Sequence, residues 1–217
     1  AAQMQIGFTT AVGGRVDKIV GNLGEIKPHL MAGAPRIFEK VYASVVSRTE
    51  AEGGAKAKIF HWAIGVGKQV AALKEEGKSV PATLSLQHSI AEKLVYSKVK
   101  ERMGGRIETF ISGSAALSKD VASWFEAIGL PILEGYGLTE TSAGTCVNRN
   151  GKVRVGTVGK PLPGTEAKIA ADGEILIRGA NVMKGYHKDP AATAEAIDAD
   201  GWLKTGDVGE IDPEGFL

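Results

Sequence analysis

The fold predicted for this chain rests mainly on residues 106–140, RIETFISGSAALSKDVASWFEAIGLPILEGYGLTE. RIETFIS alternates polar and apolar residues, which is typical of a β-strand. SKDVASWFEAIG places Val121, Trp124, Phe125 and Ile128 on one side of a helix, and Gly129 follows as a stop signal. LPIL is short and apolar, as buried strands are. The order strand, loop, helix, strand predicts a βαβ unit with two parallel strands and a right-handed crossover.

Two loops of this unit are rich in small and polar residues. GSAALS follows the first predicted strand, and EGYGLTE, residues 134–140, follows the second. In open α/β sheets, ligands bind beyond the carboxyl ends of the strands. We therefore expect both loops to face one crevice.

Upstream of this unit the sequence predicts helices. A helix is expected from about Val16 to Lys27, a short strand at LMAGA, and a further helix that starts at Pro35. Two more helices carry apolar stripes, which we interpret as core-facing. The stripe residues are Ile59, Ala63, Val66, Val70 and Leu73 in one helix, and Leu86, Ile90 and Leu94 in a helix that ends at Met103.

Downstream, after Asn148, short strands and turns replace the helices. One helix interrupts them, with Asp189 as its cap and Pro190 at its first position. The sequence therefore predicts two units: an α/β unit over residues 1–148, with a helical insertion and the two loops, and a small β-rich unit over residues 149–217.

Composition narrows the function classes. The chain has 217 residues, 43% of them hydrophobic, and a net charge of +1, so a core is feasible and the overall charge does not indicate nucleic-acid binding. Its single cysteine, Cys146, and four scattered histidines predict neither a disulfide nor a metal cluster. The sequence shows no apolar run of about 18 residues and no leader pattern. We expect a cytoplasmic protein, leave its oligomeric state open, and keep peripheral membrane contact as an alternative for the basic stretch 93–106.

The stretch EGYGLTE has the residue types of a nucleotide site. Gly135 and Gly137 let a flat ligand approach the backbone, and Tyr136 between them offers a stacking face. Thr139 and Glu140 supply oxygen atoms of the kind that bind phosphate-bound Mg²⁺. Taken alone, such a stretch is also typical of a simple turn.

Two later stretches are further candidates. In WLKTGD, Gly206 lets Asp207 project from a turn, as a carboxylate that binds ribose hydroxyls must. In GEILIRGANVMKGY, residues 173–186, a strand ends at Arg178 beside Gly179, and we favour a structural role for this stretch.

The order of four motifs carries a resemblance to a known family. SGSAALS, GYGLTET, GEILIRG with VMKGY, and WLKTGD together resemble the AMP-forming acyl-CoA synthetases of the adenylate-forming superfamily, and APRIFEKVY is similar to their long-chain subgroup. The resemblance covers essentially the whole chain. It implies an α/β fold from the large N-terminal domain of such an enzyme, in which a βαβ sheet is followed by a β-rich subdomain shaped as a distorted barrel.

The resemblance also implies roles for single residues. Tyr136 would contact adenine, with Gly113, Ser114 and Ala115 on the other side of the base, and Glu134 and Gly135 belong to the same nucleotide loop. Thr139 would contact the ATP phosphates and Glu140 would hold Mg²⁺, which makes these two the catalytic candidates. Asp207 would bind the ribose hydroxyls. The acyl pocket would be bordered by Gly137, Ala143 and Gly144.

The implied reaction uses ATP, Mg²⁺, CoA and a fatty acid: the acid attacks the α-phosphate of ATP to give acyl-AMP and pyrophosphate, and CoA then displaces AMP. Two departures stand out. Ser114 and Ala116 replace the second glycine and the proline of the family's Gly-Gly-Ala-Pro. The family's phosphate loop and lysine-bearing C-terminal domain do not occur in these residues, so we expect an internal fragment that is inactive alone. The alternatives are an aryl- or amino-acid-activating relative and a noncatalytic nucleotide-binding module.

Overall fold

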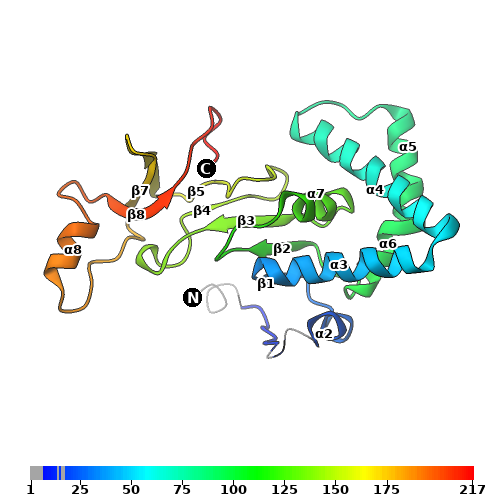
Figure 1. Ribbon diagram of the computed structural model, residues 1–217, viewed down its shortest axis with the longest axis horizontal. Coiled ribbons are helices and arrows are strands. Elements are labelled where there is room, and N and C mark those ends of the chain that lie inside the picture. The colour runs from blue at the N-terminus through cyan, green and yellow to red at the C-terminus, as the bar shows by residue number, and fades with distance from the viewer. Residues whose placement is uncertain (1–6, 14, 16–17) are drawn as a thin grey trace.

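A computed structural model describes residues 7–13, 15 and 18–217 (Figure 1). The first described helix, α2, spans Ile19–Ile26. The start of the helix expected at Val16 lies outside the described residues. In Figure 1 a central sheet separates a helical region, formed by α4, α5 and α6, from a second sheet that carries α8.

The central sheet contains the predicted βαβ unit. Its strands are β1 (Leu30–Gly33), β2 (Thr109–Ser112), β3 (Ile132–Tyr136), β4 (Cys146–Val147) and β5 (Lys160–Pro161), and they lie side by side in this order. The first three strands are parallel, and β4 and β5 join antiparallel. Helix α7 (Lys119–Ala127) connects β2 to β3. The α/β fold class predicted from residues 106–140 is thus confirmed.

An aromatic core holds the helices on this sheet. Phe38 comes from α3 (Pro35–Glu52), Phe110 from β2 and Phe125 from α7, and all three side chains are buried. Their ring centroids lie 5.3–6.0 Å apart in edge-on arrangements. Edge-to-face contacts of this kind stabilise a core beyond the area they bury. The core therefore fixes β2 and β3, whose carboxyl ends carry the two loops.

Helix α4 (Gly54–Glu75) packs closely on α7 at one glycine. A Cβ atom at Gly67 would lie 2.8 Å from the Tyr96 hydroxyl oxygen and closer still to the carbonyl oxygen of Ala127. The Tyr96 hydroxyl donates a hydrogen bond to the carbonyl of Ala63 in the same helix. Helix α4, the end of α7 and the side chain of Tyr96 thus meet at Gly67, where only a glycine fits.

The helix expected from Pro81 to Met103 is interrupted. It consists of α5 (Ala82–Ala91), a π-helical turn, η2 (Glu92–Tyr96), and α6 (Ser97–Arg102). The core-facing assignment of Leu86, Ile90 and Leu94 is wrong, because these side chains are 64%, 42% and 46% exposed. The buried residues of this segment are Ala91, Val95, Tyr96, Val99 and Met103, so the same helix has a second apolar stripe and this one faces the core. Ile59, also expected in the core, is 42% exposed.

The second sheet has three antiparallel strands in the order β6 (Thr165–Ile169), β7 (Glu174–Gly179) and β8 (Leu203–Val208). Within the described residues it is an open sheet, and the closed barrel that the resemblance implied is not found. Helix α8 (Pro190–Ala196) begins as predicted, with the Asp189 carboxylate accepting a hydrogen bond from the Ala192 amide at 2.9 Å. The division into units at residues 148 and 149 stays a prediction; β5, at Lys160–Pro161, pairs with the central sheet.

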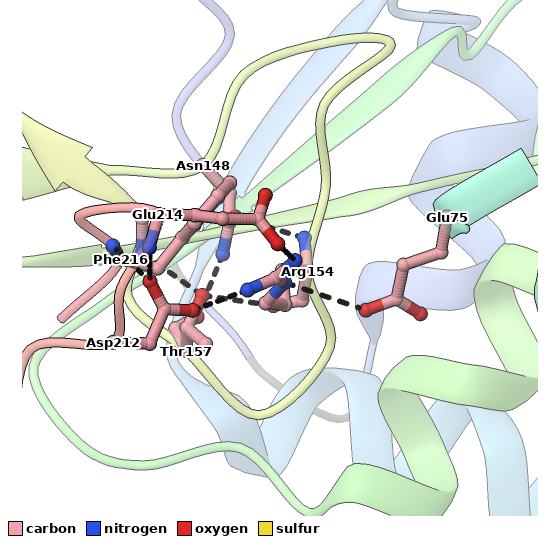
Figure 2. Close-up of polar contacts among 8 residues, drawn as sticks. Glu75, Asn148, Arg154, Thr157, Asp212, Glu214 and Phe216 are labelled. Atoms are coloured by element: carbon pink, nitrogen blue, oxygen red, sulfur yellow. Dashed lines mark hydrogen bonds and ion pairs between the residues drawn. The ribbon is translucent and has the colours of Figure 1, made fainter. Parts of the chain in front are cut away.

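The loop after β4 is tied to the last residues of the chain (Figure 2). The Arg154 guanidinium contacts the carboxylates of Asp212 and Glu214, lies 3.8 Å from Glu75 at the end of α4, and stacks on the Phe216 ring at 4.7 Å. We call these five residues the Arg154 cluster. It joins the end of α4 to the turn that follows β8.

Buried Asn148 supports the same loop (Figure 2). Its amide nitrogen Nδ2 donates to the Thr157 carbonyl at 2.6 Å, and its Oδ1 accepts from the Arg154 main-chain amide at 3.1 Å. Its own main-chain amide donates to the carbonyl of Glu134 in β3 at 2.9 Å. Asn148 thus connects the Arg154 cluster to the strand that leads into the EGYGLTE loop.

Among the described residues, no helix combines the length and the apolar character needed to cross a bilayer.

Candidate nucleotide site

The loops that follow β2 and β3 line one cavity of about 750 Å³. This volume is in the range of small-molecule sites. Most of the residues predicted for the site line it, namely Gly113, Ser114, Gly135, Tyr136, Gly137, Thr139, Ala143 and Gly144. The two loops therefore do face one crevice, as their position beyond parallel strand ends predicted.

The loop after β3 folds back on itself around Gly137. A Cβ atom there would overlap the Ala143 carbonyl oxygen, so the two ends of the loop touch where only glycine fits. Ser142 and Ala143 have positive φ angles of 54° and 84°, a conformation that non-glycine residues rarely adopt. Close approach and strain in one loop are typical of functional sites.

Two buried threonines hold this loop, and the sequence reasoning missed both. Thr141 Oγ1 accepts a hydrogen bond from the Leu138 amide at 2.9 Å, and Thr145 Oγ1 donates to Thr141 Oγ1 at 2.8 Å. Both threonines are fully buried. They fix the short 3-10 turn η3 (Thr139–Thr141), which places Thr139 at the cavity and Glu140 beside it. The sequence signal for these two residues was their position: Thr141 lies within TETSAG, residues 139–144, and Thr145 follows it.

Asp207 lies next to Tyr136, although 71 residues separate them in the chain. The Tyr136 hydroxyl donates a hydrogen bond to Asp207 Oδ2 at 2.7 Å. Burial and the Asp207 carboxylate raise the pKa of the Tyr136 phenol, so it stays protonated and remains a donor. The WLKTGD motif on β8 and the EGYG motif on β3 thus meet at the edge of one cavity.

Glu140 is held by the segment that joins β7 to α8. Its Oε1 accepts a hydrogen bond from the Tyr186 hydroxyl at 3.1 Å, and its main-chain carbonyl accepts from the Met183 amide at 2.7 Å. The described residues contain no group of three or more metal-binding side chains. The donor set still fits Mg²⁺, because this ion is commonly bound by one or two carboxylates together with substrate phosphates and water.

Four predicted residues do not line the cavity: Glu140 and Asp207, described above, and Glu134 and Ala115. Glu134 is buried, and its Oε2 accepts a hydrogen bond from the Leu117 amide at 3.4 Å. Burial raises the pKa of this carboxyl. The carboxyl is therefore turned toward the first loop, where it supports residues 113–117. Ala115 belongs to that loop but also lies outside the cavity lining.

Cys146 lines the cavity as well, and burial raises the pKa of its thiol to about 12. A thiol with this pKa is protonated at neutral pH and is a poor nucleophile. Cys146 therefore acts as a small apolar wall residue.

The chain is similar in sequence and in fold to known proteins. The sequence profile of the family described as AMP-binding enzyme matches residues 4–187. The chain is 43% identical over 204 residues to a protein named as fatty-acid–CoA ligase fadD11 of Mycobacterium tuberculosis, covering 92% of this chain and 35% of that protein. It is 36% identical over 216 residues to the long-chain-fatty-acid–CoA ligase FadD15 of Mycobacterium bovis, covering 100% of this chain and 35% of that protein.

The chain thus spans about a third of the length of these relatives. Among solved structures, the ATP-bound chimera B1 of RpMatB and BxBclM superposes with a TM-score of 0.59 at 26% identity, covering 93% of this chain and 32% of the other. Sequence, fold and the arrangement of the two loops lead to one conclusion: the chain belongs to the AMP-binding enzyme family.

Proposed function

We propose that the full-length protein activates long-chain fatty acids. In the first step a fatty-acid carboxylate attacks the α-phosphorus of ATP, so that acyl-AMP forms and pyrophosphate leaves. In the second step the CoA thiol attacks the acyl carbon, AMP leaves, and acyl-CoA forms. The family match and the names of the two mycobacterial relatives support this reaction.

The Tyr136–Asp207 hydrogen bond is the observation that supports the proposal most directly. It brings an aromatic face and a carboxylate to the same end of the cavity, which suits the adenine and ribose of one nucleotide. We assign Tyr136 to the adenine, together with Gly113, Ser114, Ala115 and Gly135, and Asp207 to the ribose hydroxyls. Glu134 supports this set through Leu117.

The phosphates and the acyl chain would follow along the same loop. Thr139 lies at the cavity and would donate its hydroxyl to a phosphate oxygen. Glu140 would hold Mg²⁺, which when bound neutralises charge on the phosphates. Gly137, Ala143 and Gly144 leave room for the acyl group, and Leu162 lines the same cavity with an apolar side chain. The chemistry then depends mainly on positioning and charge stabilisation.

We also propose a cytosolic protein that contacts a membrane surface peripherally. The single cysteine, buried and protonated, suits a reducing compartment. The exposed stripe of Leu86, Ile90 and Leu94 supports a contact with lipid, because it combines apolar side chains with nearby lysines.

The experiment is ATP–pyrophosphate exchange by the full-length protein with a panel of acids. We expect exchange and thioester formation with long-chain fatty acids. Exchange that depends on an aromatic acid or an amino acid instead would indicate a different adenylate-forming enzyme. Nucleotide binding without exchange for any acid would indicate a noncatalytic module.

A further inference from the structure

The segment between β7 and α8 holds the site loop through one asparagine. Asn181 Nδ2 donates hydrogen bonds to the main-chain carbonyls of Thr141 and Gly144, both at 3.3 Å. Its Oδ1 accepts from Thr165 Oγ1 at 3.2 Å, and its own carbonyl accepts from Ser142 Oγ at 2.9 Å. One residue of the segment between β7 and α8 is thus bonded to the site loop at three points and to β6 at a fourth.

These bonds enclose the strained part of the loop. Ser142 and Ala143, the two residues with positive φ, lie between the carbonyls of Thr141 and Gly144. A strained conformation persists only where the surrounding structure determines it. The Asn181 amide contributes to this by fixing both ends of the strained pair.

The same segment also holds Glu140. Met183 donates its amide to the Glu140 carbonyl, and Tyr186 donates its hydroxyl to the Glu140 carboxylate. The segment between β7 and α8 therefore holds this carboxylate in place. A carboxylate that must meet a metal on a phosphate chain needs such support from surrounding residues.

We propose that Asn181 is a positioning residue for Thr139 and Glu140. Its side-chain amide holds the loop Thr141–Gly144 closed, and the closed loop keeps the hydroxyl and the carboxylate turned to the phosphate end of the cavity. The proposal rests on the proposed function. It also revises the role of the GEILIRGANVMKGY stretch, whose residues lie directly against the site.

The test is Asn181→Asp in the full-length protein. The new side chain has nearly the same shape and still accepts the Thr165 hydroxyl, but it donates nothing to the two carbonyls. Asn150→Asp is the matched control, because Asn150 Oδ1 only accepts a hydrogen bond from Thr109 Oγ1, at 2.8 Å, which an aspartate also does. Thermal unfolding of both variants shows whether each is folded.

The first readout needs no nucleotide, metal or activity. Amide hydrogen exchange of the peptide spanning 137–147 should be faster by about tenfold in Asn181→Asp, since two hydrogen bonds to the loop are lost. In the same variant the amide hydrogen exchange rate of a peptide spanning β2 should not change. In Asn150→Asp the exchange rates of both peptides should equal those of the unaltered protein. Unaltered exchange at 137–147 would overturn the proposal.

The second readout is kinetic. Because a misplaced group near the reacting atoms lowers the rate steeply, kcat for pyrophosphate exchange should fall about 10- to 100-fold. The Mg²⁺ concentration for half-maximal rate should rise, while the KM for ATP stays within about twofold, because Tyr136 and Asp207 are untouched. A loss of folded protein alone would lower kcat without moving the Mg²⁺ dependence.

Tyr186→Phe provides an independent variant if Asn181→Asp does not fold. It removes only the hydroxyl that bonds Glu140, so the Mg²⁺ dependence should move in the same direction by a smaller factor. If the unaltered protein catalyses pyrophosphate exchange and both folded variants show the same kinetics as it does, only the positioning role of Asn181 is overturned. No pyrophosphate exchange in the unaltered protein would overturn the proposed function and, with it, the role of Asn181.

Discussion

Replacing Asn148 by alanine should destabilise the protein by about 2 to 4 kcal/mol. The substitution leaves the Thr157 carbonyl and the Arg154 amide without their partner, and an unsatisfied buried polar group costs about 1 to 3 kcal/mol. We take the lower part of the summed range because Arg154 and Thr157 are half-buried, so water restores some of the lost bonding. Asn148→Asp keeps the acceptor for Arg154 and should lose roughly half as much.

The assay is urea unfolding followed by tryptophan fluorescence. Asn150→Ala is the matched control: it removes an exposed asparagine two residues away and should cost about 1 kcal/mol, because it loses one side-chain hydrogen bond instead of two. Equal losses for Asn148→Ala and Asn150→Ala would contradict a supporting role for Asn148. They would mean that the loop after β4 is held by the Arg154 cluster without help from Asn148.

Four further outcomes are expected. Glu140→Ala should lower kcat and change the Mg²⁺ dependence of pyrophosphate exchange; an unchanged Mg²⁺ titration would contradict the metal assignment. Asp207→Ala should raise the KM for ATP about 10- to 100-fold, as expected for losing a charged hydrogen bond, and an unaltered KM would rule out the ribose role. Gly137→Ala should abolish ATP binding measured by calorimetry, because its Cβ overlaps the Ala143 carbonyl, and normal binding would show that the loop yields. Burial raises the pKa of Glu126 above its usual 4.5, and its Oε2 lacks a hydrogen-bond partner within the described residues, so stability is lost as pH rises through the folded pKa. Glu126→Gln should therefore melt at a higher temperature than the parent at neutral pH, with the gain vanishing in acid; a gain that grows in acid would contradict this sign.

The βαβ unit could be predicted because its information is local. The alternation in RIETFIS, the helical stripe at Val121 and Trp124, and the glycine stop each indicate one element, and the known handedness of crossovers arranges them. The shared crevice of the two loops could be predicted as well, because both loops follow the carboxyl ends of parallel strands. The proximity of Tyr136 and Asp207 was implied only by the resemblance of their motifs.

Other features could not be predicted from local patterns. The helix at 82–102 has two apolar stripes, and nothing within it tells which one faces α4; the exposed stripe contains the large apolar side chains Leu86, Ile90 and Leu94. The bonds of Asn181 to Thr141 and Gly144 reach across about 40 residues and end on main-chain carbonyls, which have no sequence signature. The resemblance assigned Glu134 to the nucleotide loop, but its carboxylate accepts a hydrogen bond from the Leu117 amide, a contact between two loops that no local pattern indicates.

The contact at Gly67 limits how the length of the helical insertion can change. Because a side chain there would collide with the Ala127 carbonyl, α4 has one permitted register on α7. A one-residue deletion between Ile64 and Gly67 would leave the glycine in place but rotate the part of α4 that precedes the deletion by about 100°. Phe60 and Ala63 would then leave the core, and His61 and Ile64 would face new neighbours. Insertions and deletions should therefore be accepted in the turns on either side of α4, at Gly53 and at residues 76–81, and rejected within the helix.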